Sequence, residues 1–573
     1  MADKKQDIDL ETIRHSASHI MAAAVIELFP EAKPTIGPAI ADGFYYDFDF
    51  RPFTPEDLKL IEKKMYDLIK QKLKFERKEI TKEEALKMFK DNKYKVELIN
   101  ELPKGEKITI YTSGKFTDLC RGPHVPDASY IGGYKLMKVA GAYWRGDAAK
   151  DQLQRIYGTA FATRDELKNY LKLLEEAEKR DHRKLGKRLN LFSFHEEAAG
   201  MPFWHPKGMI LWNLLLDYWR KEHHNAGYVE VRTPIILSRK LWMSSGHWKN
   251  FRENMYTLKI DEEDHAVKPM NCPGAILMFK EDLHSYREFP MRVGEIGLVH
   301  RHELSGVLSG LFRVRQFHQD DAHIYMTEYQ VMDEILNVIR LTDKIYKTFG
   351  LTYHMELSTR PAKSIGTDEQ WEKATMGLKK ALDKYGQPYK VNEGDGAFYG
   401  PKIDFHIKDA LGRTWQCGTI QLDMAQPANF NLTYEAEDGK KHVVTMIHRT
   451  IYGSLERFVG VLIEHFAGKF PVWLSPVQVI LLPIADRHKN YCKELKQKME
   501  NNGLRVEIDD NALTTSKKVR NAQMQYIPFI LVIGDKELES KTVNVRTRNN
   551  EVLGEIKVNQ FITDVLKDVE LMR

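Results

Sequence analysis

Apolar residues recur at helical spacing in several long segments of the chain. The pattern predicts helices over 9–29 and 54–73, the second with Thr54 as its cap and Pro55 in its first turn. The apolar stripe of this second helix consists of residues that we expect in a core: Leu58, Ile61, Met65, Leu68 and Ile69. Residues 163–188 carry a thinner stripe among many charges, which indicates a solvent-exposed connecting helix.

The stretch from Val299 to Tyr325 predicts two strands joined by a long loop that two Ser-Gly pairs punctuate. Alternate residues of a strand share one face. We therefore expect a row of side chains pointing from the loop toward His323: Arg313, Arg315, Phe317, Gln319 and Asp321. Guanidinium groups beside an aromatic ring and a carboxylate suit a phosphate, a base and an amine. The charged solvent face of an edge hairpin would have the same spacing.

Changes of pattern divide the chain into four parts. Met209–His223 is helical and leads through Gly227 into a strand that ends at Thr233 and Pro234. After Pro471, short strands alternate with helices, which predicts a small α/β domain with a mixed, mainly parallel sheet. We expect these parts: a domain at 1–165, a connecting helix at 166–190, a large domain at 191–472 and a last domain at 473–573.

The composition is that of an ordinary globular protein. With 42% hydrophobic and 29% charged residues in 573 positions, about three or four domains are expected. A formal charge of +5 is small for this length, so nucleic-acid binding would depend on a local basic surface. No apolar run reaches membrane-spanning length and the first residues lack an apolar core, so we expect neither a membrane span nor a signal peptide. Four widely spaced cysteines are typical of a reduced, cytoplasmic protein.

Two histidines near the start of the chain and a later Cys/His pair have the same four-residue spacing. His15 and His19 fall on one face of the first helix, and Cys120 and His124 flank a Gly-Pro turn. Together they could form a metal site or a general-base cluster. A plain helix face has the same spacing, and the Glu of the metalloprotease motif H-E-x-x-H is missing.

Three further candidates, Cys272, His323 and His448, are scattered, and no ligand-spacing rule joins them. The segment 393–402, EGDGAFYGPK, is Gly-rich, but Pro401 separates Gly400 from Lys402, so a P-loop is excluded. Gly453 permits a close approach of the backbone, and Arg457 would project from the first turns of the helix that follows. An exposed helix arginine would have the same pattern.

These motifs together resemble a known family. HRHE followed by GLFRVRQFHQDDAH is similar to motif 2 of class II aminoacyl-tRNA synthetases, and in detail to bacterial-type threonyl-tRNA synthetases. The helix–strand unit 209–234 resembles motif 1, and IYGSLERF resembles motif 3. HSASH, CRGPH and AGAYWRGD resemble the editing domain that threonyl- and alanyl-tRNA synthetases share. The resemblance implies an α+β multidomain fold with an antiparallel class II core, an N-terminal α+β editing domain and a C-terminal α/β anticodon-binding domain.

The family then implies a role for each matching position. One Zn²⁺ is expected on Cys272, His323 and His448. ATP with Mg²⁺ is expected to contact Arg301, Glu303, Arg313, Phe317, Gln416, Ser454 and Arg457, and threonine to contact Gln319, Asp321, Tyr399 and Gln421. His247 is placed in a polar turn near the 3′ end of tRNA, and Lys402 near the reaction centre. Editing is assigned to His15, His19, Asp118, Cys120 and His124, without a metal, and anticodon reading to Glu537, Arg546 and Arg548.

The implied partners are L-threonine, ATP and tRNA(Thr), with a homodimer formed through motif 1 and no membrane. A metal that binds the hydroxyl of threonine would reject valine by roughly 10⁴-fold or more. Serine keeps the hydroxyl and lacks one methyl, worth only about 10–200-fold, so a second, hydrolytic site would be needed. The family usually begins with a small ubiquitin-like module, and we expect this chain to lack it because only a few polar residues precede the first helix.

Three other functions would account for parts of the sequence. A prolyl- or seryl-tRNA synthetase would share the fold, but neither combines the Cys272, His323 and His448 pattern with this editing cluster. An inactive, RNA-binding paralogue would be expected to lose Arg301, Arg313 or Arg457, and all three are present. A metallohydrolase centred on the N-terminal histidines would leave the three synthetase motifs unexplained.

Overall fold

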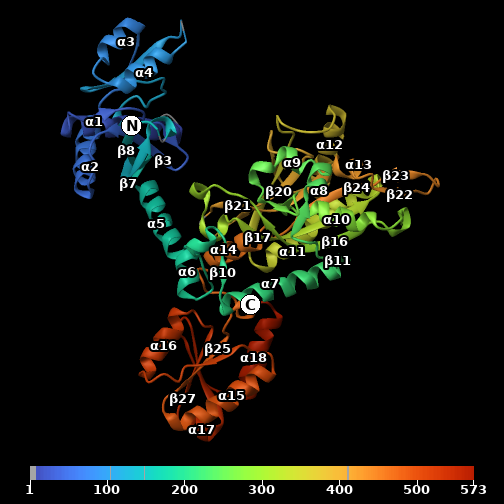
Figure 1. Ribbon diagram of the computed structural model, residues 1–573. Helices are drawn as coiled ribbons and strands as arrows, with labels where there is room; N and C mark the ends of the chain where they lie inside the picture. Colours follow the sequence, from blue (N-terminus) through green and yellow to red (C-terminus); the bar gives the residue numbers. More distant parts are fainter. Residues whose placement is uncertain (1–7, 104, 148, 410–411) are drawn as a thin grey trace. The chain divides into compact units, whose positions relative to one another are not determined.

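The computed structural model describes residues 8–103, 105–147, 149–409 and 412–573 (Figure 1). The chain divides into two compact units, residues 1–175 and 176–573. The division falls within helix α5, Arg164–Arg180, which buries none of its side chains. This helix is the first part of the exposed helix that the sequence predicts over 163–188. The prediction is wrong for the rest, because the helix breaks at Asp181 and the following helix, His182–Arg188, buries His182, Leu185 and Gly186.

The first unit is built around helix α1, Leu10–Leu28, which Asp9 caps and which buries most of its first four turns. Helix α2, Pro55–Lys70, begins with a capping box formed by Thr54, as its sequence predicts. Both helices pack on a sheet of order β1-β3-β8-β7 in which β2 also pairs with β3. Its strands are β1 Lys33–Pro34, β2 Ala39–Ile40, β3 Gly43–Asp49, β7 Gly133–Tyr143 and β8 Gln152–Phe161.

A smaller three-stranded sheet completes this unit. It consists of β4 Glu76–Ile80, β5 Ile108–Ser113 and β6 Phe116–Leu119. Helices α3, Lys82–Met88, and α4, Lys93–Glu101, lie between its first two strands in the sequence. The unit is therefore α+β, as the resemblance implies.

The second unit begins with the end of α5 and with α6, His182–Arg188, and contains a large sheet of order β11-β16-β17-β24-β21-β20-β18-β19. Its strands are β11 Tyr228–Glu230, β16 Met291–His300, β17 Gln316–Met326, β18 Thr352–Ser358, β19 Tyr389–Asn392, β20 Lys402–Lys408, β21 Thr414–Asp423 and β24 Thr445–Thr450. The pairs β11–β16 and β18–β19, at the two edges, are parallel, and the pairs between them are antiparallel. An antiparallel core is what the family resemblance predicts.

Helices and sheet share one large hydrophobic core in this unit. The helices that contribute to it are α7 Pro206–Asn225, α11 Val331–Thr348, α12 Asp368–Tyr385 and α14 Leu455–His465. Smaller elements surround them: β9 Phe192–Ser193, β10 Phe203–Trp204, β12 Ile236–Ser238, α8 Arg239–Ser244, α9 His247–Asn250, β13 Thr257–Ile260, β14 Glu263–Val267, α10 Cys272–Lys280, β15 His284–Ser285, α13 Gln426–Asn429, β22 Thr433–Glu435 and β23 Lys441–Val443.

The last part of the chain folds as a sheet of order β26-β25-β27-β28-β29. Its elements are β25 Val479–Pro483, α15 Lys489–Asn501, β26 Val506–Ile508, α16 Thr515–Met524, β27 Phe529–Ile533, α17 Asp535–Ser540, β28 Thr542–Thr547, β29 Val552–Lys557 and α18 Val558–Glu570. Separate apolar clusters under α15 and α18 and under α16 show that helices cover both faces. The sheet is mixed, but the expectation of a mainly parallel sheet is wrong, because β27–β28 and β28–β29 are antiparallel.

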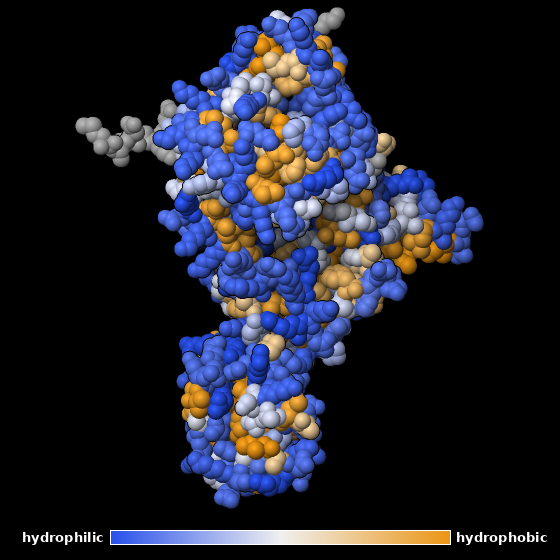
Figure 2. Space-filling model, turned by 90° about the vertical axis from the view of Figure 1, so that its left-hand side faces the viewer, coloured by the Kyte–Doolittle hydropathy of each residue, from blue (hydrophilic) through white to orange (hydrophobic). Residues whose placement is uncertain are grey.

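The exposed face in Figure 2 is mainly hydrophilic, with apolar residues in separate groups. Among the helices of the described residues, none combines the length and the apolar character that a membrane span requires.

Candidate functional site

A pocket of about 650 Å³ opens on the large sheet of the second unit. Strands β17, β20 and β21, the loop before β17 and the start of α14 supply its walls. Its lining includes these residues that the sequence singles out: Cys272, Arg301, Glu303, Arg313, Phe317, Gln319, Asp321, Tyr399, Lys402, Gln416, Gln421, His448, Ser454 and Arg457. Segments almost 200 residues apart in sequence thus meet at one site.

Strand β17 presents its odd-numbered residues to this pocket. Phe317, Gln319 and Asp321 line it, as the alternation predicts, while burial raises the pKa of Asp321 to about 6. The prediction for Arg315 is wrong. It precedes the strand, and its guanidinium donates to the carbonyls of Glu303 and Ala199 instead.

Three arginines give the pocket a positive charge. The Arg301 guanidinium lies 5.1 Å from the ring centre of Phe317, and burial lowers its pKa. Arg313 pairs with Glu303 at 2.9 Å. Arg457 donates from Nε to the carbonyl of Phe312 and from Nη1 to that of Gln416, both at 2.9 Å. Guanidinium groups fixed around a cavity are the usual arrangement for binding a polyphosphate.

A β-bulge decides which face of β21 enters the pocket. His406 pairs with Gln416 but Phe405 pairs with Gly418, so Cys417 is an extra residue. Gln416 and Gln421, five positions apart, therefore face the same way, which strict alternation forbids.

Buried Asp404 organises the polar wall next to this bulge. Its carboxylate accepts from Lys402 at 2.8 Å, from Gln416 at 2.7 Å and from Thr419 at 2.9 Å. No signal in the sequence marks Asp404, because an acidic residue inside a strand carries no motif by itself. Asp404 fixes the orientation of Lys402 and Gln416 toward the pocket.

Cys272 and His448 line the pocket, and His323 lies next to them. Each offers a ligand atom within 4.8 Å of the others, and all three are buried. His448 is oriented by Asp423, whose carboxylate lies 2.7 Å from Nε2. Both ring nitrogens of buried His323 lack a hydrogen-bond partner, which is costly unless a ligand occupies one of them. Cys272 is the first residue of helix α10.

Soft sulfur and imidazole donors with one carboxylate behind them fit a zinc ion. Asp423 is a second residue that the sequence analysis missed. Burial raises the pKa of the Cys272 thiol, and a metal would be needed to hold it as a thiolate.

Two other groups in the second unit bring potential ligands together but fit a metal less well. In the group of Asp181, His182 and Glu464, both nitrogens of His182 already have partners. In the group of His354, Glu356 and His406, both imidazoles contact the carboxylate of Glu356, at 3.0 and 3.5 Å. These contacts satisfy the side chains without an ion.

His247 borders the pocket from outside its lining. It begins helix α9 and is fully buried, so the expected polar turn is wrong. Its Nδ1 lies 2.8 Å from Ser245 Oγ and its Nε2 3.0 Å from the sulfur of Met270, which lines the pocket. Burial lowers its pKa to about 4, so the ring is neutral near pH 7.

The first unit brings its predicted residues into one cluster. Cys120 Sγ lies 3.4 Å from Nε2 of His15 and 3.3 Å from Nε2 of His124. The rings of His19 and His124 have centres 4.3 Å apart. Nδ1 of His124 contacts Ser16 Oγ at 3.0 Å. One ligand atom from each of the four lies within 4.8 Å of the rest.

Burial keeps this cluster uncharged. It lowers the pKa of all three imidazoles and raises that of Cys120 to about 11. Asp118 lies 4.0 Å from His19 and holds the ammonium of Lys95 and the hydroxyl of Tyr46. The sequence analysis missed Lys95 and Tyr46, although a lysine that is only 2% exposed marks a special environment. Neutral imidazoles beside a buried ion pair can orient a water molecule and accept its proton.

The C-terminal candidates are only partly free to meet a ligand. Glu537 caps α17 by accepting from the amide of Gly534 at 2.8 Å. Arg548 lies past the end of β28 and donates to the carbonyls of Phe470 and Tyr526, at 2.6 and 3.3 Å. Arg548 therefore lies outside the strand, while Arg546 lies on β28 and is half-buried.

Three family models match the chain. Residues 256–466 match the tRNA synthetase class II core domain (G, H, P, S and T). Residues 478–568 match an anticodon binding domain. Residues 108–157 match the threonyl and alanyl tRNA synthetase second additional domain.

Curated relatives are similar over nearly the whole chain. A threonine–tRNA ligase of Desulforapulum autotrophicum is 60% identical over 560 residues, which are 98% of this chain and 88% of the relative. One from Carboxydothermus hydrogenoformans is 56% identical over 99% of this chain and 90% of its own length. Among solved structures, the RNA binding domain of threonyl-tRNA synthetase from Cryptosporidium parvum superposes with a TM-score of 0.66 at 43% identity, over 68% of this chain and 98% of that one.

Proposed function

The chain belongs to the threonine–tRNA ligase family, and we propose that the pocket of its class II core is where L-threonine reacts with ATP and is then joined to tRNA(Thr). The observation that carries this assignment is the set of three arginines beside the Cys272, His323 and His448 cluster in one cavity. Such a cavity can hold a polyphosphate and a small polar side chain at the same time.

Activation requires the threonine carboxylate to attack the α-phosphate of ATP. We assign Arg301 to both reacting groups, because it lines the pocket 5.1 Å from the ring centre of Phe317 and its charge also interacts with that of Asp321. Arg313 and Arg457 would hold the remaining phosphates with the magnesium that accompanies ATP, and Phe317 would stack on adenine. These groups need no rearrangement to meet the developing charge, so their contribution is positioning and electrostatic stabilisation.

Cys272, His323 and His448 would hold a zinc ion, which would leave one side open for the amine and hydroxyl of threonine. Asp321, Tyr399, Gln319 and Gln421 line the same end of the pocket and would contact the amino acid. A site that must bind a hydroxyl leaves its polar partners unpaired with valine, which should cost roughly 10⁴-fold in kcat/KM.

The test combines metal content with amino-acid-dependent ATP–pyrophosphate exchange. The wild type should contain one zinc per chain and favour threonine over valine, and Cys272→Ser should lose the metal. Cys417→Ser is the matched control, since Cys417 is also buried and lines the pocket but belongs to no ligand group. Full zinc content in Cys272→Ser, or equal exchange with valine in the wild type, would contradict the proposal.

We assign editing of Ser-tRNA(Thr) to the cluster of the first unit, which matches the second additional domain in part. His15, His19 and His124 would orient the attacking water, with Asp118 held in place by Lys95. His15→Ala combined with His19→Ala should accumulate Ser-tRNA(Thr) while threonine-dependent exchange stays at the wild-type rate. Unchanged serine product would assign this unit another role.

Motif 1 is the proposed homodimer interface. Val229 is 60% exposed on edge strand β11, within the helix–strand unit that resembles motif 1. Val229→Glu should shift the protein to monomers in sedimentation. Val391→Glu is the matched control, because Val391 is 55% exposed on β19, the opposite edge strand of the same sheet. If both variants sediment alike, motif 1 is not the dimer interface.

We place the enzyme in the cytoplasm and the anticodon of tRNA(Thr) on the C-terminal domain. Support for the first is that all four cysteines are free thiols. Support for the second is the match of residues 478–568 to anticodon binding domains, with Arg546 as the candidate that the fold leaves available.

A further inference from the structure

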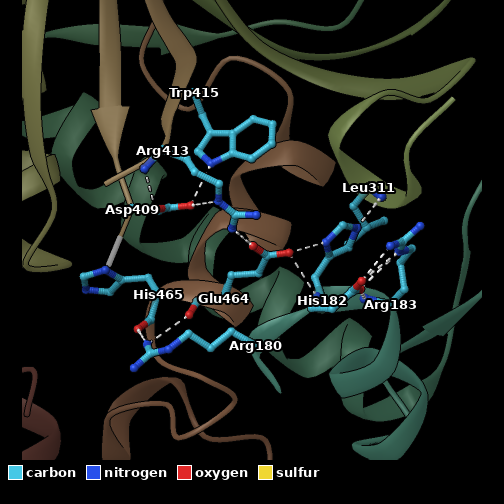
Figure 3. A network of polar contacts seen from close by, with 10 residues as sticks. Arg180, His182, Arg183, Leu311, Asp409, Arg413, Trp415, Glu464 and His465 are labelled. Carbon is cyan, nitrogen blue, oxygen red and sulfur yellow. Dashed lines mark hydrogen bonds and ion pairs between the residues drawn. The ribbon is translucent and has the colours of Figure 1, made fainter. Parts of the chain in front are cut away.

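A buried imidazole joins the connecting helix to the loop that carries Arg313. His182 is the first residue of α6 and is only 2% exposed. Its Nε2 accepts a hydrogen bond of 3.0 Å from the backbone amide of Leu311, and its Nδ1 lies 2.8 Å from Glu464 (Figure 3). Leu311 belongs to a 3-10 turn, Gly310–Phe312, directly before Arg313.

The partners of His182 fix both its charge and its tautomer. A backbone N–H can only donate, so Nε2 must present its lone pair to Leu311. The ring proton is therefore on Nδ1 and is donated to Glu464, which also accepts from the backbone amide of His182 at 3.1 Å. Arg413 neutralises Glu464 and is itself held by Asp409 at 2.7 Å (Figure 3). The network thus holds a neutral imidazole in one orientation.

The same imidazole belongs to a closed ring of contacts around the pocket. The ring of Phe312 packs on His182 with centres 4.2 Å apart, and the carbonyl of Phe312 accepts from Arg457. Arg457 and Glu464 are both on α14, seven residues and so two turns apart on one side of the helix. Glu464 in turn accepts a hydrogen bond from His182, which closes the ring of contacts. Arg313 and Arg457 are therefore both tied to this one side chain.

The loop approaches His182 so closely that Gly310 cannot carry a side chain. Gly310 has φ +49°, and a Cβ there would collide with Nε2 of His182. The backbone of the turn therefore rests against the imidazole, and the position of the ring sets the position of the turn.

We propose that His182 is a positioning residue for ATP: its neutral imidazole holds the turn 310–312 so that Arg313 and Arg457 meet the nucleotide. This inference rests on the proposed assignment of those two arginines to ATP. His182 does not touch the substrate. Its effect should therefore appear in the use of ATP and not in the binding of threonine.

Replacing His182 by asparagine or by glutamine distinguishes its hydrogen bond to Glu464 from its hydrogen bond to Leu311. The amide of asparagine can reach the position of Nδ1 and keep Glu464, whereas that of glutamine can reach the position of Nε2 and accept from Leu311. His182→Asn should raise the KM for ATP in pyrophosphate exchange by about tenfold, the effect of one lost hydrogen bond of about 1.4 kcal/mol. In His182→Gln, the KM for ATP should stay close to the wild-type value. The KM for threonine should be unchanged in both variants.

The control is His465→Gln, at the end of α14, where the backbone carbonyl and not the ring takes part in the network (Figure 3). It should leave the KM for ATP at the wild-type value. A wild-type KM for ATP in His182→Asn, or an equal loss in the Asn and Gln variants, would overturn the inference. Should His182→Asn fail to fold, Phe312→Leu takes its place: it removes the ring packed on His182 and should raise the same KM about threefold. An unchanged KM in that variant would also overturn the inference.

Arg457→Ala distinguishes failure here from failure of the proposed function. A normal use of ATP by Arg457→Ala would refute the assignment of the arginine itself. Loss of exchange in Arg457→Ala together with normal kinetics in His182→Asn would refute only the role of His182.

Discussion

Two neighbouring carboxylates on β17 have opposite tasks. Asp321 lines the pocket, whereas Asp320 is fully buried on the other face. Asp320 accepts from the amides of Ile451, Tyr452 and Gly453, at distances between 2.8 and 3.2 Å. It thereby holds the segment that leads into α14 and to Arg457.

Replacing Asp320 by asparagine should destabilise the second unit by about 3 kcal/mol, because an amide NH₂ would face these N–H donors. Urea denaturation measures the change. Asp321→Asn is the comparison: it should cost less stability and should instead raise the KM for threonine. Equal losses of stability in the two variants would contradict the division of tasks.

The sequence could assign Asp321 to the pocket because strand alternation and the motif 2 resemblance agree there. It could not give Asp320 a role, since the partners of Asp320 lie about 130 residues later. The same limit explains why Asp404, Asp423, Lys95 and Tyr46 were missed. Each is recognisable only by burial and by its contacts with distant segments, which no local spacing encodes.

The connections between elements impose their own requirements. Gly453 joins β24 to α14 with φ +76°, and a Cβ there would collide with the carbonyl of Cys417. The sequence analysis expected a close backbone approach at this glycine, and the structure confirms it.

Gly453→Ala should therefore cost about 1–3 kcal/mol of stability and displace Arg457, so that the KM for ATP rises as well. Thermal unfolding and pyrophosphate exchange measure the two effects. Gly306→Ala in the motif 2 loop is the control, because the space around that position is open. A neutral Gly453→Ala would show that the backbone there can adapt.

Helix α7 carries a pH-sensitive contact. His223 is buried against the ring of Trp219, 3.8 Å away between centres, and burial together with Arg449 lowers its pKa from 6.5 to about 2. The unfolded chain binds a proton below pH 6.5 and the folded chain does not, so the contribution of His223 to stability is lost as pH falls.

Between pH 7 and pH 5 this single group should reduce the unfolding free energy by about 2 kcal/mol. In His223→Gln, the difference in unfolding free energy between pH 7 and pH 5 should be smaller by about 2 kcal/mol. Denaturation curves measured at both pH values give this difference. His224→Gln is the control, since His224 is exposed on the same helix. An unchanged slope in His223→Gln would mean that His223 is protonated in the fold.

At the scale of the whole molecule, the two units have separate hydrophobic cores. Their order along the chain and several of their helices, among them α1, α2, α7 and α14, could be predicted from periodicity and capping residues, whereas α11 and α12 were missed. The direction of strand pairing in the last domain could not, because parallel β26, VEI, and antiparallel β28, TVNVRT, both alternate apolar and polar residues.

Separate cores predict separate unfolding. Ile61 is fully buried in the first unit, so Ile61→Ala should reduce the unfolding free energy of that unit by about 2–5 kcal/mol. Its calorimetric transition should move to a lower temperature. The other transition and threonine-dependent exchange should not change. A common shift of both transitions would show that the units unfold together.

The extra residue at Cys417 fixes which face of the sheet each residue of β21 occupies. Everything before it in the strand is shifted by one position relative to everything after it, so removing one residue there would exchange inside for outside at Trp415 and Gln416. Point substitutions leave this alternation of faces unchanged, whereas inserting or deleting one residue reverses it on one side of the bulge. Efforts to alter nucleotide preference can therefore substitute single pocket-facing side chains of this strand, but must conserve its length.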